Sequence, residues 1–99
     1  MDDDVVGFHA QQTVEKSIKA VLVVNGIDFP RTHDLDFLVA RVKGQGAPAP
    51  SAVANAGWLS PWAAQLRYDE SSADLDRDLA VEAGSVAVDW AEARLGVSP

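Results

Sequence analysis

The chain has 99 residues, of which 47% are hydrophobic, and we expect residues 1–99 to form one small globular domain. Its formal net charge is −7, which argues against tight, non-specific binding to the phosphates of RNA or DNA. It contains no cysteine, which excludes disulfides, thiolate metal sites and a thiol nucleophile. The acidic start, Met1-Asp2-Asp3-Asp4, and the absence of a long apolar run favour a cytoplasmic protein with no membrane contact.

The first predicted element is a helix from about Asp4 to Asn25. The acidic residues at its start supply N-cap oxygens and suit the positive end of the helix dipole. Asn25-Gly26 is a typical stop signal, because glycine tolerates the left-handed conformation that ends many helices. Apolar residues at helical spacing predict a buried stripe along this helix: Val6, Ala10, Val14, Ile18, Val21 and Leu22.

A second helix is predicted after a short connection that contains Pro30. Thr32 is its expected N-cap, Asp34 lies in its first turn, and Gly44 is expected to end it. The residues GQGAPAPS that follow are typical of a loop. The apolar residues of this helix again follow helical spacing: Leu35, Leu38, Val39 and Val42.

The rest of the chain predicts a helical stretch in two pieces, 51–58 and 60–68, and a last helix from about Ser72 to Arg94. Ser60-Pro61 is a good N-cap and first-turn pair for the second piece. The pattern predicts an all-α fold, an antiparallel up-and-down bundle with short connections. So many apolar positions in so thin a bundle indicate a homodimer or a higher oligomer. The expected buried face of the last helix comprises Leu75, Leu79, Ala83, Val86 and Trp90.

The segment FHAQQTVEKSIKAVLVVNGIDFPRTHDL, residues 8–35, closely resembles the signature of HEPN domains. The later segment LSPWAAQLRYDE, residues 59–70, is similar to the short helix of that family that ends in Arg-Tyr. The resemblance covers roughly residues 7–94 and implies a bundle of four or five helices that dimerises. Family members usually carry a long helix before the FHAQQ segment, so we expect this domain to be an N-terminally shortened form.

The resemblance also implies a function. HEPN proteins are commonly encoded beside a small nucleotidyltransferase, with which they form a toxin–antitoxin-like pair. Some members are metal-independent ribonucleases, and others are thought to bind nucleotides or only their partner. The ribonucleases carry an arginine and, four to six residues later, a histidine. The chain has only two histidines, His9 and His33, and neither follows an arginine at that spacing.

We therefore expect no catalytic residues, no metal and no cofactor. The favoured function is protein binding and nucleotide binding as the partner of a nucleotidyltransferase. The alternative is a metal-independent ribonuclease toxin with an atypical active site, built on Arg31 and His33 or on Arg67.

Two sets of residues are candidates for a site. The first could hold a phosphate through its cations and stack a base on its tyrosine, and comprises Arg31, His33, Lys16, Arg67 and Tyr68. For these residues a structural role, in capping and closing the bundle, is the alternative. The second set could form a hydrogen-bonded network or an interface that fixes helix register, with nucleotide binding or plain exposure as alternatives, and comprises Gln11, Gln12, Glu15, Lys19 and Asp34. Within it, Glu15 stands one helical turn before Lys19 and can pair with it.

Overall fold

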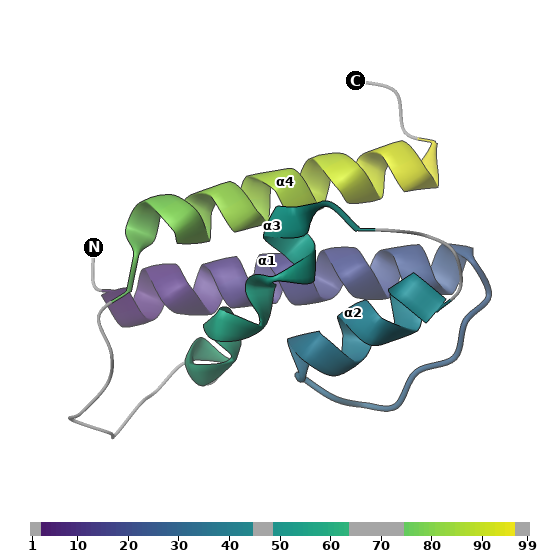
Figure 1. Cartoon of the computed structure of the whole chain (residues 1–99), viewed down its shortest axis with the longest axis horizontal. Helices are drawn as coiled ribbons and strands as arrows, with labels where there is room; N and C mark the ends of the chain where they lie inside the picture. The colour runs from purple at the N-terminus through teal and green to yellow at the C-terminus, as the bar shows by residue number, and fades with distance from the viewer. Residues whose placement is uncertain (1–2, 45–48, 64–74, 97–99) are drawn as a thin grey trace.

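A computed structural model describes residues 3–44, 49–63 and 75–96. These residues form helices and the segments that connect them, with no strand among them. The all-α fold predicted from the sequence is thus confirmed. In chain order the elements are α1 (Asp3–Val24), α2 (Leu35–Gly44), α3 (Ser51–Ala54), the 3-10 helix η1 (Ala56–Trp62) and α4 (Arg77–Leu95) (Figure 1).

The two long helices, α1 and α4, pack along each other and run in the same direction (Figure 1). At their starts, Arg77 Nε donates to Asp3 Oδ1. Farther along, Gly84 faces Thr13, and a Cβ atom on this glycine would lie 3.6 Å from Thr13 Cγ2. The predicted antiparallel, up-and-down arrangement is therefore wrong for this pair. The intervening segment, which contains α2, α3 and η1, returns the chain to the N-terminal end of α1 before α4 begins.

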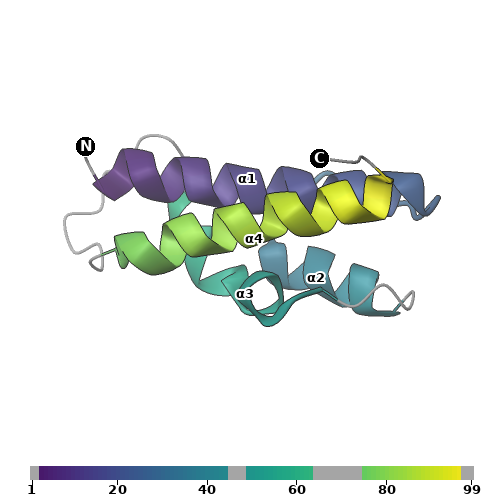
Figure 2. The same ribbon diagram turned by 90° about the horizontal axis from the view of Figure 1, so that it is seen from above.

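The hydrophobic core lies between this helix pair and the shorter helices. Both α2 and α3 are found on the same side of the pair (Figure 2). The predicted stripes of α1 and α2 face this core, except that Val6 is only half-buried at the N-terminal end of α1. The largest fully buried apolar side chains come from α1, α2, α3 and η1: Val14, Ile18, Val21, Leu22, Leu35, Leu38, Val42, Val53 and Leu59.

The N-terminal half of α1 is packed against η1. Gly7 allows the indole of Trp62 to approach the α1 backbone, because a Cβ atom at this position would overlap with Cγ and Cδ1 of the ring. The helix η1 passes through Ser60 and Pro61 without interruption, so the predicted start of a new helix at Ser60 is wrong. The proline φ angle suits a 3-10 helix as well as the first turn of an α-helix. Residues 64–68 of that predicted piece lie outside the described residues.

Glycines end both long helices. Gly26 (φ 68°) follows α1, as the Asn25-Gly26 stop signal predicts, and Gly96 (φ 74°) follows α4. The start of α4 differs from the prediction, because it begins at Arg77 with Asp76 as its N-cap, and the Asp76 side chain accepts from the backbone N–H of Leu79.

The buried face of α4 agrees with the prediction at Ala83 and Trp90, and Leu75, just before the helix, is also buried as predicted. The prediction is wrong at Leu79, which is 52% exposed, because small residues of α4 face the core and α1. Side chains of this size let two helix backbones approach closely, so the close α1–α4 contact selects this face and leaves Leu79 outside. The small buried residues of α4 are Ala80, Ala83, Gly84, Ala87 and Ala91.

Candidate polar site between α1 and α2

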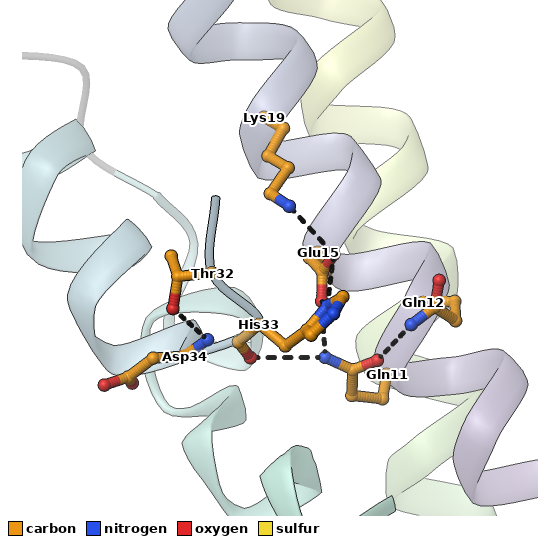
Figure 3. A network of polar contacts seen from close by, with 7 residues as sticks. All are labelled: Gln11, Gln12, Glu15, Lys19, Thr32, His33 and Asp34. Atoms are coloured by element: carbon orange, nitrogen blue, oxygen red, sulfur yellow. Dashed lines mark hydrogen bonds and ion pairs between the residues drawn. The ribbon is translucent and has the colours of Figure 1, made fainter. Parts of the chain in front are cut away.

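The polar residues of α1 gather around the carboxylate of Glu15 (Figure 3). Gln11 Nε2 donates to Glu15 Oε1 at 2.8 Å, and Lys19 Nζ donates to Oε2 at 3.0 Å. Residues four apart on a helix lie on the same face, so the helix itself brings these three side chains together. Gln11 is fully buried, and the side chain of Glu15 is only 4% exposed.

His33 joins this cluster from the connection between α1 and α2 (Figure 3). Its Nδ1 atom lies 2.9 Å from Oε1 and 3.1 Å from Oε2 of Glu15. Gln11 Nε2 also donates to the backbone oxygen of His33, at 3.4 Å, and Gln12 Nε2 donates to Gln11 Oε1 at 2.8 Å. The imidazole therefore covers a buried carboxylate, while its own side chain remains 65% exposed.

The electrostatics of the cluster favour an ionised Glu15. Burial raises the pKa of this carboxyl, but hydrogen bonds from Gln11, Lys19 and His33 and the charge of Lys19 act in the opposite direction and prevail. The net result is a pKa below the ordinary value for glutamic acid. An ionised carboxylate can only accept hydrogen bonds, so His33 must donate through Nδ1. The neutral ring therefore carries its proton on Nδ1 and leaves Nε2 as an acceptor.

Two contacts that the sequence analysis missed also hold the connection in place. Lys19 Nζ lies 5.9 Å from the centroid of the Phe29 ring, close enough for a cation–π interaction. Arg41 of α2 donates to the backbone oxygen of Asp28. Neither contact could be predicted from the spacing of residues in the sequence, because each joins a helix to an irregular segment.

Asp34 and Thr32 shape the start of α2. Asp34 Oδ1 accepts from the backbone N–H of Phe37 at 3.2 Å, which makes Asp34 the N-cap. Thr32 Oγ1 accepts from the backbone N–H of Asp34 at 3.1 Å, so it stabilises the turn before the cap. The sequence analysis placed the cap at Thr32, whereas the structure places it two residues later.

The Asp34→Ala substitution is expected to lower the free energy of unfolding by about 1 kcal/mol, because the first turn of α2 loses its side-chain acceptor. The Asp34→Asn variant keeps an acceptor oxygen and should lose clearly less. Urea denaturation followed by circular dichroism measures both values. A larger loss in Thr32→Ala than in Asp34→Ala would contradict the assignment of the cap.

The other candidate residues do not join the cluster. Arg31 and Lys16 are exposed, and neither makes a hydrogen bond or an ion pair with a residue that the structure describes. Arg67 and Tyr68 lie outside the described ranges. His9 is exposed on α1, where its ring meets the ring of Phe8 edge-on at a centroid distance of 5.6 Å. The cluster therefore brings together Gln11, Gln12, Glu15, Lys19 and His33.

A second surface feature is an apolar groove of about 460 Å³ between α1 and α4. Its lining contains no aspartate, glutamate, lysine or arginine. Val81 and Val88, on the α4 side, have exposed side chains. The residues that line the groove are Val6, His9, Ala10, Thr13, Ala80, Val81, Gly84, Ser85 and Val88.

These features define a small helical domain in which a polar cluster joins the first helix to the connection that follows it. A family model described as HEPN domain matches residues 2–89. The chain therefore belongs to the HEPN domain family, as the segment at residues 8–35 indicates. No curated protein and no solved structure gave a match.

None of the helices in the described part of the chain is long and apolar enough to cross a membrane. Within residues 3–44, 49–63 and 75–96, no three histidine, aspartate or glutamate side chains are grouped so that they could hold a metal ion.

Proposed function

We propose that this HEPN domain acts by binding rather than by catalysis, as the cytoplasmic partner of a small nucleotidyltransferase in a toxin–antitoxin-like pair. We propose that it also binds a nucleotide. The observation that carries this proposal is the bond between Glu15 and His33. It fixes the connection after α1 in a defined conformation, and that connection offers the exposed side chains of Arg31 and His33 to a ligand or partner.

A ribonuclease toxin with an atypical site is the alternative, and two observations weigh against it. RNA cleavage without a metal needs a general acid and a general base placed on either side of one phosphate. Here the two histidines have different surroundings, since His9 lines the groove with α4 and His33 contacts Glu15. The sequence also lacks an arginine followed after four to six residues by a histidine.

The proposal includes a homodimer or a higher oligomer. The groove between α1 and α4 supports it, because an apolar surface without charged side chains is stabilised by burial at about 25 cal/mol per Å². Two copies of a chain with net charge −7 repel each other, so an interface free of acidic residues is the favourable place for them to meet.

Affinity capture of the tagged protein from its own cells tests the proposal, with bound protein and nucleic acid both identified by mass. We expect a nucleotidyltransferase and no RNA. The double variant Arg31→Ala/His33→Ala should recover less partner, and the matched control Arg94→Ala, at an exposed cation near the end of α4, should recover as much as the wild type. Recovery of a specific RNA that the wild type shortens with time, and that the His33→Ala variant leaves intact, would overturn the proposal. The protein would then be the ribonuclease toxin.

A further inference from the structure

The Glu15–His33 pair has a consequence for how a phosphate could bind. We propose that His33 Nε2 is a proton-linked donor to a phosphate group of a nucleotide, so that the domain binds its ligand more tightly as the pH falls. This inference rests on the proposed nucleotide binding and assigns its contact to one atom.

The imidazole ring of His33 has a fixed orientation. Both carboxylate oxygens of Glu15 lie within hydrogen-bond distance of His33 Nδ1. The carboxylate is itself held by Gln11 and Lys19, and Gln11 also bonds the backbone oxygen of His33. The ring therefore keeps Nδ1 toward the interior. Its Nε2 atom has no partner among the described residues, and the side chain is 65% exposed.

The proton of the neutral ring has a defined position. In the neutral ring, Glu15 retains the proton on Nδ1, and Nε2 presents a lone pair that repels the lone pairs of a phosphate oxygen. When the ring takes up one proton from solvent, Nδ1–H still donates to Glu15 and Nε2–H becomes free to donate to phosphate. Such charge-assisted hydrogen bonds are the strong ones. Each bound phosphate thus requires one proton on the ring.

The charges around His33 come from α1, the connection and α2. These elements carry five cations, Lys16, Lys19, Arg31, Arg41 and Lys43, and six carboxylates, Asp3, Asp4, Glu15, Asp28, Asp34 and Asp36. Their net charge is −1 while the ring is neutral, and protonation of the ring removes this negative charge. Asp34 directs a carboxylate oxygen toward its cap bond with Phe37, and Arg31, two residues before His33 in the sequence, is exposed.

Isothermal titration of the full-length protein with ATP, from about pH 5.5 to about pH 8.5, tests this inference across the range in which histidine titrates. At each pH the affinity of the wild type for ATP is compared with that of His33→Gln. The phosphate groups of ATP titrate in the same way in both experiments, so their effect cancels in this comparison. We expect His33→Gln to bind about tenfold more weakly than wild type at the acidic end, as for a lost charged hydrogen bond, and equally at the alkaline end. Inorganic phosphate should compete with ATP at the acidic end.

Two further variants make the test specific. His33→Arg carries a permanent positive charge at this position. Its affinity for ATP, relative to that of His33→Gln, should therefore be the same at every pH. Arg94→Gln removes an exposed cation near the end of α4, away from the cluster, and should behave as wild type. Circular dichroism checks that each variant is folded, and His33→Arg keeps the test decisive should His33→Gln unfold.

The outcomes separate this inference from the proposed function. A constant ratio between wild type and His33→Gln at all pH values would overturn the proton-linked contact while leaving nucleotide binding intact. Equal binding by both proteins at all pH values would place the nucleotide elsewhere and also overturn it. If ATP binds at no pH, this inference and the proposed nucleotide binding both fail, while the nucleotidyltransferase partner is still decided by affinity capture.

Discussion

The Gly7→Ala substitution is expected to lower the free energy of unfolding by about 1–3 kcal/mol, as for an overpacked core. The new Cβ atom would overlap with the ring of Trp62, which is only 4% exposed and cannot move aside without leaving its place against α1. Alanine favours a helix over glycine by about 0.5–1 kcal/mol, and this gain offsets only part of the loss. Chemical denaturation with urea measures the difference.

Gly84→Ala is the matched control, because it places the same methyl group inside the other long helix. There the nearest atom, Thr13 Cγ2, would lie at 3.6 Å, which is an ordinary van der Waals contact. We expect no loss, and a gain of up to about 1 kcal/mol from helix propensity. Equal effects of the two substitutions would mean that the approach of Trp62 to α1 is not what requires glycine at position 7.

The Glu15→Ala substitution is expected to lower the free energy of unfolding by about 1–3 kcal/mol. Its main cause is Gln11, whose amide is fully buried and would lose its short hydrogen bond. Lys19 and His33 are partly exposed and can return to water, so they add less. Glu15→Gln keeps the volume and an acceptor oxygen and should lose less than Glu15→Ala. Lys16→Ala, at the exposed neighbour, should change stability by less than about 0.5 kcal/mol.

The contribution of Glu15 to the free energy of unfolding should also depend on pH, and it should decrease as the solution is acidified. Its pKa is lower in the folded protein than in the unfolded chain, so the carboxylate form is favoured by folding. The stabilisation is complete above the unfolded-state pKa, about 4.3 for an ordinary glutamate, and is lost as the pH falls through the lower folded value. Unfolding free energies of wild type and Glu15→Gln should therefore converge on acidification below about pH 4. A difference that is constant or grows in this range would contradict the lowered pKa.

Local features of the fold could be predicted from the sequence, and the direction of the chain could not. The apolar stripe and the Asn25-Gly26 stop of α1 depend on residues close in sequence, and the structure agrees with both. Helical periodicity indicates which face of a helix is apolar. It does not indicate which other helix packs against that face, or in which direction that helix runs. This is why the parallel course of α1 and α4 and the exposed position of Leu79 differ from the prediction.

The same distinction applies to the polar cluster. The pairing of Glu15 with Lys19 follows from their spacing on one helix. The approach of His33 was one of several arrangements that the sequence left open, because a histidine on a connection can turn toward a helix or toward solvent. The contacts of Phe29 and Arg41 with the connection depend on its path through space, which no local pattern specifies.

The pairing of α1 with α4 has a consequence for the order in which the domain can be made. The first long helix has its most extensive packing against the last one, so a chain emerging from the ribosome exposes the α4-facing side of α1 until the C-terminal segment is synthesised. Contacts between distant segments also require the closure of a long loop, which slows folding relative to bundles built from sequence neighbours. Nascent chains that stop before Arg77 should therefore present the apolar side of α1 to chaperones, and the native state should form only after α4 has emerged from the ribosome.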